Sequence, residues 1–150
     1  MIHPLLSNYF FNPTGCREIK IRSDKWGDGS YGARRKKATG EVYAHRGVDL
    51  LCIPGQNIYA PFDSVYERIV YPYSDNFEYT GALLRSEKAI VKMLYFKPGI
   101  KEGTRIKKGT VIGKAQDVSR YYCADDTLLE ERMKPHIHFE IVGFDPVLLF

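Results

Sequence analysis

The chain has 150 residues and a net charge of +4, and 44% of its residues are hydrophobic. These values are typical of a folded globular protein and exclude a disordered or fibrous one. A chain of this length can fold around one core without a metal or disulfide, so we expect a single domain over residues 1–150. No apolar run reaches the ~18 residues of a membrane span, and the first residues lack the order of a signal peptide. Because the fold does not need a metal for its stability, a metal site in this chain is expected to be functional.

Short segments rich in Val, Ile, Tyr and Phe alternate with Gly and Pro, which indicates strands joined by turns. Residues 1–15 are predicted to form an extended arm laid on the domain. Strands are predicted, in chain order, over residues 18–22, 47–53, 57–60, 63–70, 89–96, 110–114 and 134–142. A helical pattern is confined to residues 125–133, with Thr127 and Glu130 as a capping box. The expected fold is mainly β, a single-domain antiparallel sheet scaffold with long loops and at most one short helix.

Two motifs in the first third of the chain suggest nucleotide or nucleic-acid binding, and neither has the surroundings that such a site needs. Residues 27–32 match G-x-G-x-x-G, but a dinucleotide site requires a buried strand before the motif and a helix after it. Charged residues flank it here, so we expect a flexible turn. The basic run at residues 34–37 is interpreted as a solvated loop, because no aromatic RNA-binding motif, zinc-finger spacing or basic helix accompanies it. We therefore expect no nucleic-acid partner.

Three of the four histidines fall into two clusters, in which His45 precedes Asp49 and His136 precedes His138. On a strand, His136, His138 and Glu140 share one face, and the Cα atoms of the two histidines are about 7 Å apart. One of them can then bind a metal while the other reaches the reacting groups beside it. On a straight strand His45 and Asp49 would lie about 13 Å apart, too far for ligands of one metal.

A bend at Gly47 would bring His45 and Asp49 within reach of the same metal. Two histidines and one carboxylate, with a fourth position open, are typical of a catalytic zinc site. The sequence therefore predicts His45, Asp49 and His138 as zinc ligands, with His136 as general base or oxyanion stabiliser. The alternative interpretation is that these are ordinary core or surface histidines whose spacing arose by chance.

The ordered set of motifs resembles the lysostaphin-type zinc endopeptidases, which cut peptide cross-links of bacterial cell walls. Supporting segments follow at residues 58–61, 106–113 and 145–146. The resemblance implies the lysostaphin-type peptidase fold, a Zn²⁺ cofactor, the ligand set His45, Asp49 and His138, and a catalytic role for His136. One departure stands out, because Lys97 occupies the place of a further catalytic histidine. A lysine can offer charge to an oxyanion but is a poor proton relay at neutral pH.

The chain is also similar to the leukocyte cell-derived chemotaxins, secreted zinc proteins on the same fold. The similar segments are residues 24–35, 45–52, 59–62 and 91–98. That family also has lysine at the position of Lys97, and it is regarded as a receptor ligand without peptidase activity. Its cysteine pattern implies a disulfide between Cys16 and Cys52, and it leaves Cys123 free.

Two functions from different classes follow from these resemblances. The chain is either a zinc endopeptidase acting on short glycine-rich or D-amino-acid-containing peptides of peptidoglycan, with activity weakened by Lys97, or a catalytically silent ligand of a cell-surface receptor. Both predict a location outside the cell or facing the cell wall, including a phage particle, without membrane insertion. Neither predicts an oligomeric state.

Overall fold

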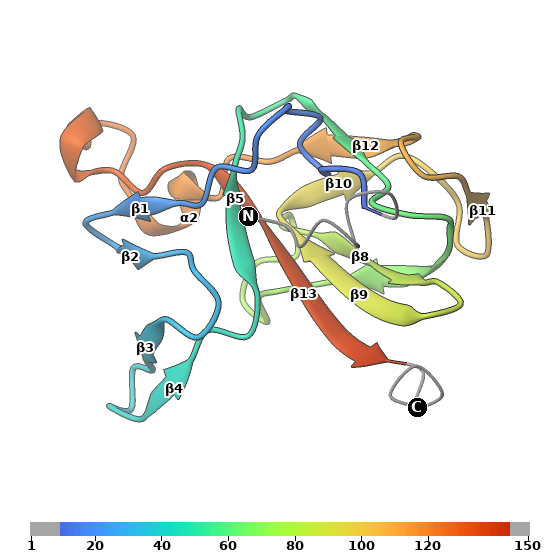
Figure 1. The fold of residues 1–150 in the computed structure, drawn as a ribbon. Coiled ribbons are helices and arrows are strands. Elements are labelled where there is room, and N and C mark those ends of the chain that lie inside the picture. The colour runs from blue at the N-terminus through green and yellow to red at the C-terminus, as the bar shows by residue number, and fades with distance from the viewer. Residues whose placement is uncertain (1–9, 145–150) are drawn as a thin grey trace.

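The computed structural model describes residues 10–144 and consists mainly of short strands joined by long turns (Figure 1). The strands are β1 (Ser23–Asp24), β2 (Gly27–Asp28), β3 (Arg34–Lys36), β4 (Val42–Ala44), β5 (Val48–Leu51), β6 (Asn57–Tyr59), β7 (Ser64–Val70), β8 (Gly81–Arg85), β9 (Ala89–Leu94), β10 (Phe96–Pro98), β11 (Arg105–Ile106), β12 (Val111–Ala115) and β13 (His136–Phe144). The helical elements are α2 (Ser119–Tyr122) and the 3₁₀ turn η1 (Leu129–Glu131). The predicted mainly β, antiparallel fold class is confirmed.

Two antiparallel sheets form the body of the domain. The larger has six strands in the order β11-β7-β8-β9-β13-β5, and the smaller has three in the order β10-β12-β6. Two small hairpins, β1–β2 and β3–β4, project beside β5, away from the other strands of the large sheet (Figure 1). The hairpins therefore lie at the end of the large sheet where β5 and β13 meet.

The hydrophobic core is formed by side chains from both sheets, which pack into one cluster. The fully buried members from the large sheet are Leu50, Leu84, Val91, Met93 and Ile137, and those from the small sheet are Ile58, Phe96 and Ile112. Alternation along β13 places Ile137 in this core and turns His136 and His138 to the opposite face. The core thereby fixes the strand that carries two of the four histidines.

The predicted strands agree best with the structure where one face is buried and the other is not. Residues 18–22 were also predicted to form a strand, but they form only an isolated bridge from Ile21 to Leu50. Strand β8 (Gly81–Arg85) was missed, since its mostly buried residues on both faces give no alternation in hydrophobicity.

The predicted helix over residues 125–133 was wrong. That segment contains only η1 (Leu129–Glu131), whose N-cap residue is Leu128 and which has no side-chain cap, so the expected capping box does not form. Leu128 and Leu129 are largely exposed, so the segment has no apolar face packed on the core to stabilise a helix. The single helical turn α2 (Ser119–Tyr122), which lies just before it, was not predicted.

Both motifs of the first third of the chain lie in hairpins. Residues Arg34–Lys36 form β3 and pair with β4, so the expected solvated loop is a two-stranded ribbon. Gly27–Asp28 form β2, followed by the turn that leads to β3, and no helix follows the glycines. The G-x-G-x-x-G match therefore lacks the helix that would face a dinucleotide pyrophosphate.

Residues 10–15 lie against the body of the domain. The backbone N–H of Phe11 donates to the carbonyl of Pro61 at 2.7 Å, and the Phe10 ring meets the Phe139 ring edge-on with centroids 5.5 Å apart. The remainder of the predicted arm, residues 1–9, is outside the described residues. The contacts of Phe10 and Phe11 connect the start of the described chain to the core.

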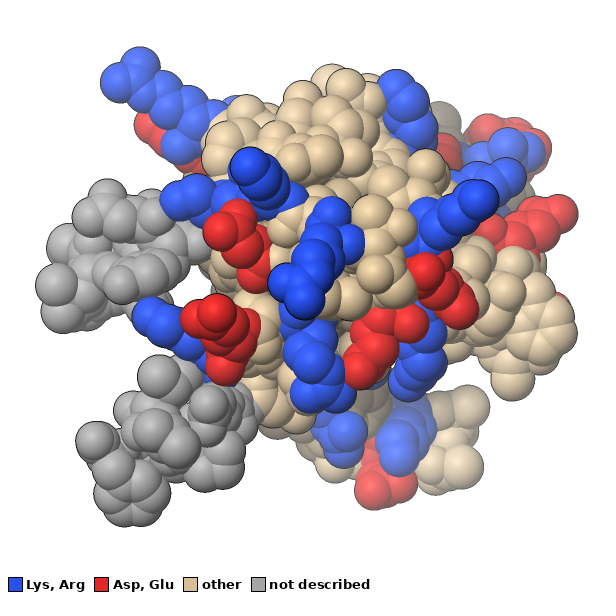
Figure 2. Space-filling model, turned by 90° about the vertical axis from the view of Figure 1, so that its right-hand side faces the viewer, with Lys and Arg blue, Asp and Glu red and all other residues tan. Residues whose placement is uncertain are grey.

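The surface charge is mixed. Figure 2 shows a face on which Lys and Arg side chains form a band flanked by Asp and Glu. Ion pairs of this kind are present between β7 and β8, where Arg85 lies 2.9 Å from Glu67. The helices of residues 10–144 are at most four residues long, so none of them could cross a membrane.

Candidate metal centre

Strand pairing brings the first histidine cluster to the second. In the antiparallel ladder between β5 and β13, Asp49 lies directly opposite His138, so their side chains share one face. His45 precedes β5 and reaches the same place because the chain bends at Gly47, as predicted. A Cβ atom at Gly47 would lie 2.3 Å from the carbonyl oxygen of Phe139, so only glycine allows the bend to pack directly on β13.

The three predicted ligand atoms form a nearly equilateral triangle. His45 Nε2 and Asp49 Oδ1 are 3.3 Å apart, His138 Nδ1 and Asp49 Oδ1 are 3.1 Å apart, and the two imidazole nitrogens are 3.2 Å apart. Ligands bound to tetrahedral zinc at about 2.0–2.1 Å lie roughly 3.3 Å from one another. All three residues are buried. The spacing therefore matches one face of a zinc coordination tetrahedron.

Hydrogen bonds outside the triangle fix the state of each imidazole. His45 Nδ1 is 3.1 Å from the carbonyl oxygen of Ser30, which can only accept, so Nδ1 carries the proton and Nε2 presents a lone pair. His138 Nε2 donates to Glu140 at 2.9 Å, which leaves a lone pair on Nδ1. Two lone pairs and the Asp49 carboxylate oxygen thus converge with no proton between them. Such a donor set is repulsive until a cation binds, so the residues fit a zinc ion.

The second oxygen of Asp49 is held by two arginines. Arg22 Nε lies 3.3 Å and Arg35 Nη2 3.5 Å from Asp49 Oδ2, and Arg22 is itself paired with Asp24 at 2.8 Å. The positive charges of these two guanidinium groups favour the ionised form of the carboxyl group. Asp49 is therefore an ionised carboxylate with one oxygen fixed and the other directed at the triangle.

His136 stands beside the triangle without belonging to it. Its Nδ1 donates to the carbonyl of Lys134 at 2.8 Å, which leaves Nε2 unprotonated and 3.8 Å from Asp49 Oδ2. Burial lowers the pKa of His136. The Tyr95 ring packs edge-on against the imidazole with centroids 5.3 Å apart. His136 is therefore a neutral, oriented base next to the three ligand atoms.

Tyr95 is the one non-glycine residue with positive φ among residues 10–144, at +74°. Its backbone N–H donates to the carbonyl of Thr80 at 2.8 Å, which helps to hold this strained conformation. Burial raises the pKa of the Tyr95 and Tyr73 hydroxyls, so both stay protonated. Tyr73 stacks on Tyr121 at 3.8 Å and shares a hydrogen bond with Tyr122 at 2.8 Å. Together these tyrosines form an aromatic cluster beside His136.

The structure thus brings together His45, Asp49, His136 and His138, whereas Lys97 makes no hydrogen bond or ion pair with any of these four residues. Lys97 is exposed on β10, opposite Lys114 of β12, and its ammonium makes no hydrogen bond or ion pair with residues 10–144. The catalytic part assigned to Lys97 stays a prediction.

Sequence reasoning missed Arg22 and Arg35, because their contacts with Asp49 bridge 27 and 14 residues of chain. The basic run containing Arg35 was noticed, but it was interpreted only as a solvated loop. Arg22, at 3% exposure, has a burial unusual for arginine. No local pattern in the sequence marks such a burial in advance.

The cysteines are separate thiols in the structure, with Cys16 exposed, Cys52 half-buried and Cys123 buried. Burial, with a smaller contribution from nearby Cys16, raises the pKa of the Cys52 thiol to about 12. Cys16 and Cys52 are not joined in the structure. The disulfide between them stays a prediction.

Several curated proteins are similar in sequence, while no protein-family model matches. Myeloid protein 1 of Gallus gallus is 35% identical over 113 residues, which are 74% of this chain but only 32% of that protein. Leukocyte cell-derived chemotaxin-2 of Bos taurus is 32% identical over 128 residues, 84% of this chain and 76% of that protein. Peptidoglycan DD-endopeptidase ShyC of Vibrio cholerae is 30% identical over 111 residues, 73% of this chain and 22% of that protein.

Solved structures of peptidases share the fold. A zinc-containing peptidase from Vibrio cholerae matches 89% of this chain and 36% of its own with a TM-score of 0.58 and 23% identity. The catalytic domain of lysostaphin from Staphylococcus simulans matches 83% of this chain and 90% of its own with a TM-score of 0.50 and 17% identity. The chain therefore has the lysostaphin-type peptidase fold, and it belongs to the leukocyte cell-derived chemotaxin-2 family.

Proposed function

We propose that this chain is a zinc-dependent endopeptidase domain that acts on peptide cross-links of bacterial peptidoglycan. One observation carries the proposal. Two imidazole lone pairs and one carboxylate oxygen converge within 3.3 Å of one another, next to an unprotonated nitrogen of His136. A site that only held a structural metal would not need that fourth, oriented base.

The residues have separable roles in peptide hydrolysis. His45, Asp49 and His138 would hold the zinc ion, which when bound polarises a peptide carbonyl and lowers the pKa of water. His136 accepts a proton through Nε2 as the nucleophile forms, and its Nδ1–H bond to the Lys134 carbonyl stabilises the resulting imidazolium. The same group then returns the proton to the leaving amine.

Two neighbours keep these groups in place. Tyr95 packs against the His136 ring and limits its rotation. The arginines on Asp49 Oδ2 fix the carboxylate so that Oδ1 alone faces the other ligands. Such preorganisation avoids rearrangement of the site during the reaction.

The choice of substrate is supported by similarity. ShyC is named as a peptidoglycan DD-endopeptidase, and structures of the same fold come from peptidases. A domain with this substrate would work outside the cell or at the cell wall. Lys97, in the place of a second catalytic histidine, is expected to make turnover slow, because lysine is a poorer proton relay than histidine.

A second candidate is a catalytically silent zinc protein that acts as an extracellular ligand of a cell-surface receptor. Membership of the chemotaxin-2 family favours it, together with the exposed position of Lys97, whose ammonium makes no hydrogen bond with the His136 side chain. In this case the zinc ion would serve stability or recognition.

Incubation of purified peptidoglycan with the zinc-loaded protein distinguishes the two candidates. The peptidase proposal predicts new amine termini that appear slowly with the natural chain and are absent with the His136→Gln variant. The matched control is His136→Gln loaded with zinc to the same content, so that a loss of metal does not explain a loss of cleavage. If the natural chain releases no amine termini, the peptidase proposal is wrong and the receptor-ligand candidate remains.

A further inference from the structure

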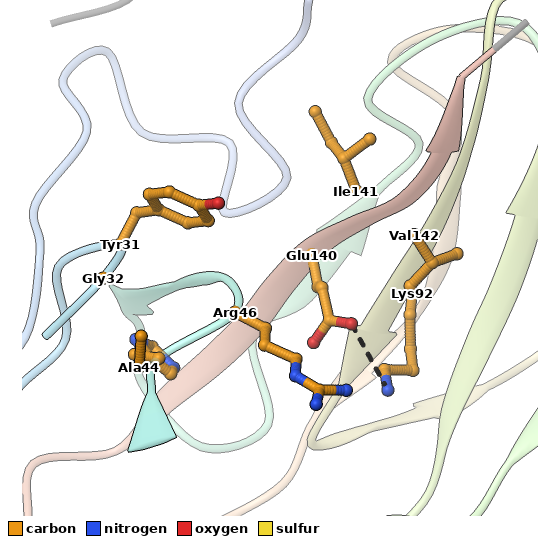
Figure 3. Close-up of a pocket in the computed structure, with 9 residues that line it drawn as sticks. Tyr31, Gly32, Ala44, Arg46, Lys92, Glu140, Ile141 and Val142 are labelled. Carbon is orange, nitrogen blue, oxygen red and sulfur yellow. Dashed lines mark ion pairs between the residues drawn. The ribbon is translucent and has the colours of Figure 1, made fainter. Parts of the chain in front are cut away.

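A cavity of about 520 Å³ opens beside the metal centre along β13 (Figure 3). His45 and Glu140, the hydrogen-bond acceptor of His138, lie in its wall, so the cavity borders the metal centre. The rest of the lining includes Arg46 and Lys92 as charged residues, and Ile141 as an apolar one. A molecule bound there would therefore lie next to His45 and Glu140.

One edge of β13 is open in this cavity. Strand β5 pairs with β13 only from His136 to Phe139, whereas β9 pairs with it as far as Phe144. Beyond Phe139, the edge of β13 that had paired with β5 has no strand partner among residues 10–144. Ile141 and Val142, which line the cavity here, are 44% and 45% exposed. An open strand edge of this kind can pair with an extended peptide.

The cavity also has an excess positive charge. The two oxygens of Glu140 are engaged, one by His138 at 2.9 Å and the other by Lys92 at 3.6 Å. The guanidinium of Arg46 makes no hydrogen bond or ion pair with any residue that the structure describes, and it extends across the cavity toward the Lys92–Glu140 pair (Figure 3). Arg46 is therefore a cation without a counter-charge in an otherwise paired lining.

We propose that this cavity binds the carboxylate-bearing end of an extended peptide, which pairs with the open edge of β13 and places its carboxylate on Arg46. The planar guanidinium binds a carboxylate through two parallel hydrogen bonds, so it selects an acidic end over a neutral one. The backbone of the peptide then runs along the open edge of β13, past Ile141 and Val142. This inference deepens the proposed function. Only the cleavage of the bound peptide depends on the peptidase proposal.

Peptide titration of the zinc-loaded full chain tests this site. The probes are N-acetyl-tetraalanine with a free terminal carboxylate and the same peptide with a terminal amide. The binding of each peptide is measured by calorimetry or by backbone NMR shifts. We expect the free acid to bind about fivefold more tightly, the upper range for an ion pair that stays in contact with water. Arg46→Gln should abolish the difference, and Arg105→Gln, on β11 at the opposite edge of the large sheet, should preserve it.

Inorganic phosphate provides a further probe. If phosphate binds as tightly as the peptide acid, the site holds free anions without using the strand edge, and the proposal is overturned. The same holds if the two peptides bind equally, if neither binds at millimolar concentration, or if Arg46→Gln leaves the preference intact. Repeating the titration with His136→Gln separates binding from cleavage. If the chain binds the acid peptide selectively but cuts no peptidoglycan, the proposed peptide-binding site is supported and the peptidase proposal is contradicted.

Discussion

Glu140 is expected to tune the metal centre although it is not one of the proposed ligands. Its carboxylate accepts the Nε2–H of His138 at 2.9 Å, which fixes the imidazole with Nδ1 toward His45 and Asp49. In Glu140→Ala this acceptor is lost, so the ring can rotate and exchange its tautomer. The lone pair on Nδ1 is then present in only part of the population, and the affinity for zinc falls.

The expected loss is 10- to 100-fold in zinc affinity, or about 1.4–2.7 kcal/mol, because removal of a partner behind a histidine ligand has effects of this size. The Glu140 carboxylate is held between His138 and Lys92, so a water molecule that entered in its place would not fix the imidazole as firmly. Competition against a chromophoric zinc chelator at fixed pH measures the dissociation constant directly. Glu140→Gln retains an acceptor oxygen for His138 and should lose less affinity than Glu140→Ala.

The matched control is Glu67→Ala, which removes a carboxylate paired with Arg85 at 2.9 Å on β7, away from β13. This variant should bind zinc as the natural chain does. Equal zinc affinity in Glu140→Ala and the natural chain would refute the reasoning, because it would mean that His138 needs no partner to hold its orientation.

Four further outcomes are expected. Zinc at 100 times its dissociation constant should stabilise the fold by about 2.7 kcal/mol, measured as a rise in melting temperature over the chelator-treated protein, and no rise would contradict specific binding. Arg22→Met should destabilise the metal-free protein by about 3–5 kcal/mol, because it leaves the buried carboxylate of Asp24 without its arginine partner and Asp49 with Arg35 alone. An unchanged melting temperature would show that Arg22 does not stabilise them. Thiol titration of the unfolded, unreduced chain should find one free cysteine if the Cys16–Cys52 bridge forms in solution, whereas three would exclude it. Lys97→His should speed the release of amine termini from peptidoglycan, and an unchanged rate would remove Lys97 as the cause of slow turnover.

The sheet architecture could be predicted where one strand face meets the core. The alternation at residues 134–142 indicated β13 with His136 and His138 on a common face, and the structure has them so. By contrast, β8 (Gly81–Arg85) is mostly buried on both faces and gives no such pattern. A strand of this kind is recognised only when its neighbours, β7 and β9, are in place.

The helix prediction over residues 125–133 shows the opposite error. Thr127 and Glu130 have the spacing of a capping box, but a local signal of this size does not stabilise a helix with no apolar face on the core. Leu129, at 86% exposure, has nothing to pack against among the described residues. Local propensity was therefore overridden by the lack of tertiary contacts.

The convergence of His45, Asp49 and His138 could be predicted because metal-binding chemistry is encoded in residue type. A histidine and an aspartate separated by a glycine bend, with a second histidine pair on a strand, leave few other arrangements. The outer layer could not be predicted, because Ser30, Arg22 and Arg35 act through a backbone carbonyl or through long-range contacts. Their placement depends on the β1–β2 and β3–β4 hairpins, which have no hydrophobic pattern of their own.

Metal analysis of the purified protein tests the proposed zinc centre most directly. The chain should hold one zinc ion per molecule after dialysis against metal-free buffer, and Asp49→Asn should hold much less, because the amide removes the negative charge from the ligand set. Arg105→Gln, far from β13, should hold as much zinc as the natural chain. A natural chain that binds no zinc, or an Asp49→Asn variant that binds it unchanged, would contradict the assignment of His45, Asp49 and His138.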